Sequence, residues 1–155
     1  MIKRNTGKVL GLAAIVTLAL AACGDNAFGP DPTEVTFAAS LGIDLANMTM
    51  NQSGLYYRDD VIGEGATAAA NDIATVTYSG YLVDGTQFDG GIFQFVITSG
   101  GAIAGFVEGV TGMRVGGERT LVVPPALAYG SSGFQGIPGD AVLVFDVALD
   151  VLATP

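Results

Sequence analysis

Histidine and tryptophan are absent from the 155-residue sequence, and cysteine occurs once, at Cys23. Without histidine, and with a single thiol, the chain cannot assemble a Ser-His-Asp triad, a Cys-His dyad or the usual ligand set of a zinc site. An intrachain disulfide is also excluded, because it needs two cysteines. We therefore expect no bound metal and no cofactor.

Lysine and arginine are scarce as well: six of them stand against 15 acidic residues, which gives a formal net charge of −9 at pH 7. Three of the six, Lys3, Arg4 and Lys8, precede the first apolar run. Without these three, the chain keeps three arginines and no lysine against the same 15 acids, a formal charge of −12. Nucleic acid is therefore not an expected partner, since phosphate binding depends on clustered lysine and arginine.

An uncharged apolar run from Val9 to Ala22 follows the basic residues. Its 14 residues are too few to span a bilayer as a helix, which takes ~20, and the basic-then-apolar order is typical of an export signal. The run ends in LAAC, which resembles the bacterial lipobox, where a small residue precedes a cysteine that becomes lipidated. We predict a lipoprotein signal peptide over residues 1–22 and a lipid anchor on Cys23. The alternatives are an ordinary leader cut nearby and a buried thiol.

Residues 23–50 are predicted to hold the lipidated cysteine and a tether. The stretch GPDPT argues against regular structure there, and TFAASLGIDLANM is expected to form a short helix or turn packed on the domain. Gly24 stands where an aspartate would signal inner-membrane retention. The expected location is therefore the cell envelope, with the chain anchored to the outer membrane and facing the periplasm.

Residues 51–155 are predicted to form one domain of α+β class. Alternating apolar and polar residues indicate about five antiparallel strands, in the stretches LYYRD, IATVTYSGYLV, IFQFVI, ERTLVV and AVLVFDVALDV. The stretch AGFVEGVTGM places Phe106, Val110 and Met113 at helical spacing, although each of its glycines costs ~1 kcal/mol relative to alanine. A curved sheet wrapped around this one short helix would bury the apolar stripe of the helix.

Four ordered segments between about Gly54 and Leu152 resemble the FKBP family of peptidyl-prolyl cis/trans isomerases. They are VTYSGYLVDGTQFDGGIFQFVI, GFVEGVTGMRVGGERTLVVPP, ALAYGSSGFQGIPGD and AVLVFDVAL, which include the family elements Y-x-G-x-L-x-D-G-x-x-F-D, A-Y-G and L-V-F-D-V-x-L. The resemblance implies an FKBP-like fold and an isomerase that acts on X-Pro bonds of exported proteins. Proline-containing polypeptides are then the expected partners, macrolide compounds the expected inhibitors, and a monomer the expected state.

Such an enzyme suits a chain without histidine or a usable thiol, because rotation about an X-Pro bond needs no nucleophile. The barrier of ~18–20 kcal/mol comes from lost amide resonance, and an apolar pocket that strips water favours the twisted, less charge-separated state. An acceleration of about 10³ to 10⁶ corresponds to only ~4–8 kcal/mol.

The resemblance also assigns roles to individual residues. Asp89 would order the pocket by hydrogen bonding, Tyr129 would bind a substrate carbonyl through its hydroxyl, and Phe106 would form the pocket floor. The catalytic set is then Tyr78, Phe88, Asp89 and Tyr129, and the substrate-binding set is Phe93, Ile103, Phe106, Ile137 and Phe145. Ile137 would lie over the pocket in a flap, and Ile103 at the entrance to the helix.

Three departures from the family pattern affect these expectations. First, Phe106 stands where many members have tryptophan. Second, only GGI separates Asp89 from Phe93, so the basic residue that often pairs with the carboxylate is missing, and Tyr78 is expected to replace it. Third, Phe134 occupies a position that is often histidine. Two other functions remain open on this evidence. One is a weakly catalytic chaperone or scaffold that binds proline segments, and the other is an envelope lipoprotein with a vestigial pocket.

Overall fold

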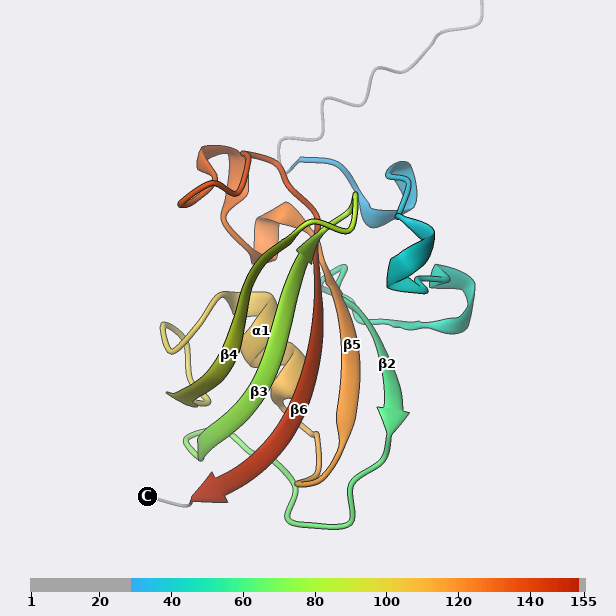
Figure 1. Cartoon of the computed structure of the whole chain (residues 1–155). Helices are drawn as coiled ribbons and strands as arrows, with labels where there is room; N and C mark the ends of the chain where they lie inside the picture. The colour runs from blue at the N-terminus through green and yellow to red at the C-terminus, as the bar shows by residue number, and fades with distance from the viewer. Residues whose placement is uncertain (1–28, 154–155) are drawn as a thin grey trace, which may run out of the picture.

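The computed structural model of the chain describes residues 29–153 (Figure 1). The predicted signal peptide, Cys23 and the first part of the predicted tether lie outside these residues. Among the described residues, no helix has the length and hydropathy needed to cross a membrane.

A six-stranded antiparallel sheet with the strand order β1-β2-β5-β6-β3-β4 dominates the described part of the chain. The strands are β1 Thr49–Met50, β2 Tyr56–Val61, β3 Ile73–Leu82, β4 Gln87–Val96, β5 Glu118–Val123 and β6 Leu143–Ala153. The sheet curves around α1, Ala104–Val110, the one α-helix of residues 29–153 (Figure 1). The predicted α+β class and the curved sheet around a short helix are confirmed, and the two-residue β1 adds a strand to the expected five.

The alternation of apolar residues along β6 explains why one sheet face is buried. Leu143, Phe145, Val147 and Leu149 are at most 4% exposed, and they pack in the main core together with α1. On β3, the neighbouring strand, Val76 belongs to the same core, whereas Thr77 is exposed and donates a hydrogen bond to Asp150. The polar face predicted for β3 therefore points away from the helix.

Strand β4 begins earlier than the sequence predicted, at Gln87 instead of Ile92. Because only two glycines separate Asp89 from Ile92, there is no room for a loop, and the chain stays paired with β3 from Asp89 onward. Phe88 and Asp89 therefore lie within a strand and not in a turn. This places them beside Gly80 of β3, the Cα partner of Asp89.

Helix α1 is three residues shorter than the predicted stretch, since it ends at Val110 and Gly112 adopts a positive φ of 82°. Phe106 and Val110 face the sheet and are buried. Gly105 and Gly109 lie against β5, where an added Cβ would overlap Val123 and Leu121 respectively. The glycines that weaken the helix are therefore the residues that let it approach the sheet.

The opposite face of the sheet carries a second, smaller core. Three 3-10 helices, η1 Pro32–Glu34, η2 Ala39–Leu41 and η3 Leu45–Asn47, lie along it. Apolar residues of this segment pack against the buried Val122, Val142 and Val144; they are Val35, Phe37, Leu41, Ile43, Leu45 and Met48. The expected short helix or turn packed on the domain is present, and the packing extends further toward the N-terminus than the sequence indicated.

Candidate active site

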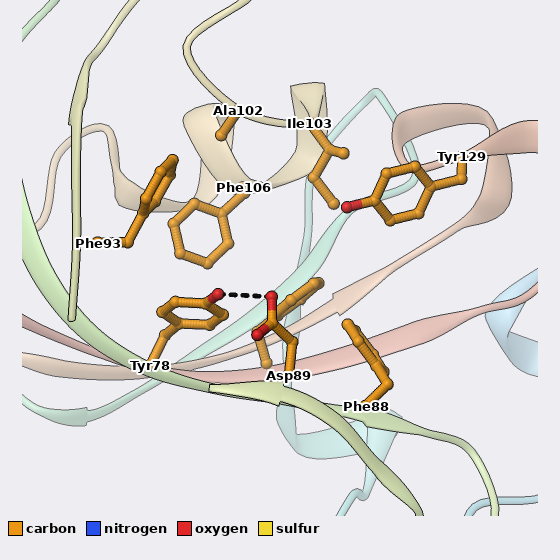
Figure 2. Close-up of a pocket in the computed structure, with 9 residues that line it drawn as sticks. Tyr78, Phe88, Asp89, Phe93, Ala102, Ile103, Phe106 and Tyr129 are labelled. Atoms are coloured by element: carbon orange, nitrogen blue, oxygen red, sulfur yellow. Dashed lines mark hydrogen bonds between the residues drawn. The ribbon is translucent and has the colours of Figure 1, made fainter. Parts of the chain in front are cut away.

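An aromatic cavity of about 190 Å³ opens between the concave face of the sheet and the start of α1 (Figure 2). An engineered cavity of about 150 Å³ holds benzene, so a five-membered proline ring fits this volume. The lining residues are Tyr78, Phe88, Asp89, Phe93, Ala102, Ile103, Phe106, Tyr129 and Phe145.

These side chains come from separate elements that the fold brings together. Tyr78 lies on β3, Phe93 on β4 and Phe145 on β6, while Phe106 lies on α1. Phe88 and Phe145 meet edge to face over Gly80, with ring centroids 5.7 Å apart. A Cβ at position 80 would come within 2.9 Å of both rings, so glycine is required there for the two aromatic walls to meet.

Phe106 forms the floor of the cavity and is 3% exposed. Its ring contacts Tyr78 at 5.7 Å and Phe145 at 5.3 Å between centroids, with interplanar angles of 77° and 79°. It also meets Phe93 and Phe95 at similar distances. Edge-to-face pairs of this kind add about 0.5–1.5 kcal/mol each beyond area burial. The floor is therefore a ring fixed by four aromatic neighbours, which provides a preformed apolar surface.

One carboxylate, Asp89, lies at the wall of this apolar cavity. Tyr78 donates its hydroxyl hydrogen to Asp89 Oδ2 at 2.7 Å, shown as the dashed line in Figure 2. The backbone N–H of Gly90 donates to Asp89 Oδ1 at 2.8 Å. The expectation that Tyr78 replaces the missing basic partner of Asp89 is confirmed.

All three arginines of the described chain are bonded elsewhere. Arg58 pairs with Asp60, and Arg119 pairs with Asp59 and donates to the carbonyl of Gly109. Arg114 donates to the backbone carbonyl of Gly65. Since no cation stands next to Asp89 among the described residues, hydrogen-bond donors alone satisfy its carboxylate.

Burial, together with the hydrogen bond and negative charge of Asp89, raises the pKa of Tyr78 to about 12. The pKa of Tyr129 is also raised, first by burial and then by the charge of Asp89. Both hydroxyls therefore keep their protons at neutral pH and act as hydrogen-bond donors.

The two hydroxyls differ in their availability. That of Tyr78 is occupied by Asp89, whereas that of Tyr129 has no hydrogen-bond partner within residues 29–153. In Figure 2 the Tyr129 oxygen points into the cavity beside Ile103. The Tyr129 ring is stacked on Phe134, with centroids 5.0 Å apart and planes at 10°. This stacking limits the motion of Tyr129 and leaves its hydroxyl as a free donor at the rim.

Eight of the nine residues predicted for the pocket line it, and Ile137 does not. The backbone groups of Phe134 and Ile137 close a tight turn through reciprocal hydrogen bonds of 3.0 and 2.8 Å. Ile137 is 8% exposed and packs into the main core. Ile137 is therefore not a lining residue, and its predicted place in a flap over the cavity stays a prediction.

Sequence reasoning missed one lining residue, Ala102. It precedes Ile103 at the start of α1, and its methyl group carries no chemical signal in the sequence. Only its position in the stretch GGAIAGF, next to the predicted Ile103, could have indicated it. Cys23, the predicted lipidation site, lies outside the described residues.

The cavity offers neither a nucleophile nor a metal site. Within the described chain, no group of three or more histidine, cysteine, aspartate or glutamate residues could hold a metal ion. What the cavity provides is an apolar wall that excludes water, a carboxylate that orders one side of it, and a free hydroxyl donor at the rim. Such a site can change the conformation of a bound chain without making or breaking a covalent bond.

A curved antiparallel sheet around one short helix, with an aromatic cavity that contains a single carboxylate, defines the class of FKBP-type domains. The chain belongs to this family: the family model described as FKBP_C, FKBP-type peptidyl-prolyl cis-trans isomerase, matches residues 64–150. The resemblance expected from the sequence motifs is therefore confirmed.

Curated relatives agree with this assignment. The chain is 39% identical over 109 residues to the FKBP-type peptidyl-prolyl cis-trans isomerase FkpA of Escherichia coli, across 68% of this chain and 40% of that protein. It is 44% identical over 100 residues to FK506-binding protein 4 of Gibberella zeae, across 62% of this chain and 20% of that protein. The chain therefore spans a fifth to two fifths of the length of these relatives.

Solved structures show the same fold. The crystal structure of FkpA from Escherichia coli aligns with a TM-score of 0.65 at 35% identity, over 70% of this chain and 52% of that one. The crystal structure of AtFKBP13 aligns with a TM-score of 0.64 at 33% identity, over 68% of this chain and 98% of that one. In the second comparison, the aligned part of this chain corresponds to nearly the whole of the other chain.

Proposed function

We propose that the domain accelerates cis/trans isomerisation of X-Pro peptide bonds. The observation that carries this proposal is the preformed aromatic cavity with Phe106 as its floor and the Tyr78–Asp89 hydrogen bond at its wall. Family membership supports it, because the family is defined by this activity.

The chemistry follows from the nature of the barrier. A planar X-Pro amide is stabilised by charge separation between nitrogen and oxygen, and water solvates this charge. When the proline enters the cavity, aromatic side chains replace that water, which favours the twisted amide with its less polar carbonyl. No proton needs to be transferred, and lowering the barrier by about 4–8 kcal/mol gives an acceleration of 10³ to 10⁶.

Polar groups of the site orient the substrate in this scheme. The free hydroxyl of Tyr129 donates a hydrogen bond to a carbonyl next to the proline. Asp89 keeps the Tyr78 ring in place as a wall of the cavity through the 2.7 Å hydrogen bond. Asp89 is therefore a residue that shapes the cavity and not a general acid.

We further propose that the chain is an exported lipoprotein that acts on proline-containing segments of other exported proteins. The basic residues, the apolar run Val9–Ala22 and the LAAC sequence support a lipid anchor on Cys23. An outer-membrane position facing the periplasm fits Gly24 in place of an aspartate. Binding of FK506-type macrolides is part of this proposal, since relatives bear the name FK506-binding protein.

A protease-coupled assay with a proline tetrapeptide tests the proposed activity. We expect kcat/KM to fall about tenfold or more for Phe88→Ala and for Asp89→Val, which corresponds to ~1.4 kcal/mol of lost transition-state stabilisation per tenfold. Gln94→Ala is the matched control, because Gln94 lies on the same strand and is exposed, bonded to Thr75 and absent from the cavity lining. Background rates for all four proteins, wild type included, would refute the proposal.

A second candidate function is a chaperone or scaffold that holds proline segments with little turnover. The observation that favours it is Phe106, whose ring keeps an apolar floor but has no N–H donor to offer the substrate. FK506-type binding without measurable isomerisation would favour this alternative. Recovery of activity by Phe106→Trp would then identify the floor as the cause.

A further inference from the structure

The segment that leads from the proposed anchor to the domain is itself part of the folded structure. We call residues 29–48 the anchor-side segment. Its apolar side chains cover Val122, Val142 and Val144, which are at most 3% exposed. A hydrogen bond also holds the segment on the sheet, since the Arg58 guanidinium donates to the carbonyl of Gly42. The segment lies before the residues that the family model matches, which begin at residue 64.

The anchor-side segment contacts the β3–β4 turn, residues 83–86, which leads into Phe88 and Asp89 of the cavity. The N–H of Ala38 donates to the carbonyl of Val83 at 2.7 Å. A Cβ built on Gly85 would lie 3.0 Å from Ser40 Oγ and 3.4 Å from Ala38 Cβ. The segment therefore packs against the turn that precedes Phe88 and Asp89.

Its first residue contacts the flap, residues 130–140, which follows Tyr129. A Cβ built on Gly29 would lie 2.9 Å from Asp140 Oδ1 and 2.9 Å from Pro125 Cγ. The segment, the flap and the β3–β4 turn lie at one end of the molecule, and β6 ends at the opposite end, near the mark C in Figure 1. The chain therefore enters the domain beside the turn that precedes Phe88 and Asp89 and beside the flap that follows Tyr129.

The distance that the chain between Cys23 and the folded domain can span follows from the position of Gly29; we call this stretch, residues 23–29, the link. Six steps along the chain separate Cys23 from Gly29, and even a fully extended chain covers only about 20 Å over six residues. A link that ran freely from Cys23 to Met50 would reach about 100 Å. For comparison, a domain of this size has a radius of gyration of about 14 Å. The link between anchor and domain is therefore short compared with the diameter of the domain.

We propose that the docked anchor-side segment holds the flap end of the domain against the membrane surface, so that the cavity acts on prolines of polypeptides that lie at that surface. This inference rests on the proposed lipidation of Cys23. The substrate class that it names is a proline segment of a polypeptide held at the membrane surface.

Energy transfer from a single dye to acceptors in the lipid headgroups tests the orientation, with the palmitate-labelled, full-length mature protein in vesicles. One variant carries the dye on a cysteine introduced in the flap by Ser132→Cys. The matched control variant carries the dye on a cysteine introduced at the end of β6 by Ala153→Cys. Both positions are exposed, and lipidation blocks the thiol of Cys23. We expect stronger transfer from position 132 than from position 153. Equal transfer, or stronger transfer from position 153, would overturn the orientation.

A lengthened link tests the consequence for substrate choice without altering the folded domain. About 20 Gly/Ser residues inserted between Asn26 and Ala27 add an r.m.s. span of roughly 25 Å. We expect the insertion to lower the isomerisation rate of a proline peptide attached to vesicles by a short spacer, and to leave the rate on a soluble peptide unchanged. Equal rates on the vesicle peptide, with and without the insertion, would contradict the inference.

The outcomes separate this inference from the proposals on which it rests. If the wild-type protein incorporates no palmitate and does not bind vesicles, as expected for a Cys23→Ser variant, the anchor proposal is wrong. The proposed orientation is then wrong as well. If the soluble peptide is not isomerised, the enzymatic proposal is wrong, while the energy-transfer comparison still decides the orientation.

Discussion

At the scale of single residues, the hydrogen bond between Tyr78 and Asp89 places one charge at the wall of an otherwise aromatic cavity. Asp89 is exposed, but its carboxylate lines an aromatic cavity and needs hydrogen-bond compensation on that side. Here two donors, the Tyr78 hydroxyl and the Gly90 N–H, provide it without any cation. The arrangement fixes the Tyr78 ring and leaves the hydroxyl of Tyr129 free for substrate.

A measurement of the pKa values of the tyrosines tests the hydrogen bond between Tyr78 and Asp89. The pKa of Tyr78 is raised from 10.0 to about 12 by burial and by Asp89, so the folded state favours its neutral form. The associated stability is complete below pH 10 and is lost as the pH rises through about 12. In a spectroscopic titration of tyrosinate on the mature protein, we expect Tyr78→Phe to remove the late step near pH 12.

Asp89→Asn provides the matched comparison for this titration. It removes the negative charge but keeps the burial, so the pKa of Tyr78 should fall and still remain above 10. A smaller decrease is expected for Tyr129, whose pKa is raised mainly by burial. An unchanged titration in Asp89→Asn would show that the carboxylate does not interact with these hydroxyls.

At the scale of elements, helix α1 is held by packing and not by its own propensity. Its seven residues include two glycines, each of which costs about 1 kcal/mol relative to alanine in a helix. Arg119 supports its end by donating to the carbonyl of Gly109 at 2.8 Å while it pairs with Asp59. The glycines are needed because the helix lies close to β5, and this close approach places Phe106 at the floor of the cavity.

Replacement of Gly105 by alanine tests the close approach of α1 to β5. The added methyl group would overlap Val123 Cγ1, and Val123 is fully buried and stiff at χ1. Overpacking costs about 1–3 kcal/mol, so the free energy of unfolding should fall despite the better helix propensity. Chemical denaturation measures this change.

The double variant Gly105→Ala/Val123→Ala is the control for this prediction. In the Val123→Ala background the contact with Val123 Cγ1 is removed and only the longer contacts of 3.2 and 3.3 Å with Leu127 remain, so adding Gly105→Ala should cost less stability than it does in the wild type. Stabilisation by Gly105→Ala alone would contradict the packing argument, because propensity would then outweigh contact with β5.

At the scale of the whole molecule, two cores lie on opposite faces of one sheet. The main core includes α1 and the cavity floor, and the second core consists of the anchor-side segment over Val122, Val142 and Val144. Both cores lie on the same strands, so removing the anchor-side segment would expose Val122, Val142 and Val144 to water.

A protein that begins at Asn51 should therefore be less stable than one that begins at Gly24. Full burial of a large apolar side chain contributes about 1.5–3 kcal/mol. The six apolar side chains of the anchor-side segment are only partly buried. We therefore expect the free energy of unfolding to fall by a few kcal/mol. Urea denaturation should also show a smaller m-value, since less surface is exposed on unfolding. A protein that begins at Gly29 serves as the control, and its free energy of unfolding should equal that of the protein that begins at Gly24. If the protein that begins at Asn51 were as stable as these two, the second core would not contribute to stability.

Local sequence patterns predicted the regular elements and most of the cavity. Alternation identified β6, and the ordered FKBP motifs identified eight lining residues, because these positions carry distinctive side chains at fixed spacing. Ile137 does not line the cavity, and its position depends on a turn closed by backbone hydrogen bonds that the sequence does not reveal. Ala102 was missed because a methyl group becomes part of a wall only through its neighbours.

The sequence was enough to predict the α+β class, five of the six strands and eight of the residues that line the cavity. These properties follow from side-chain chemistry and from short-range periodicity, which need no knowledge of distant contacts. The tertiary structure decided that Asp89 is compensated by Tyr78 and that the glycines of α1 serve its approach to β5. It also decided that residues 29–48 pack on the sheet beside the cavity loops. Each of these depends on which residues meet across the fold, and such contacts are fixed only when the sheet curves around the helix and buries both of its faces.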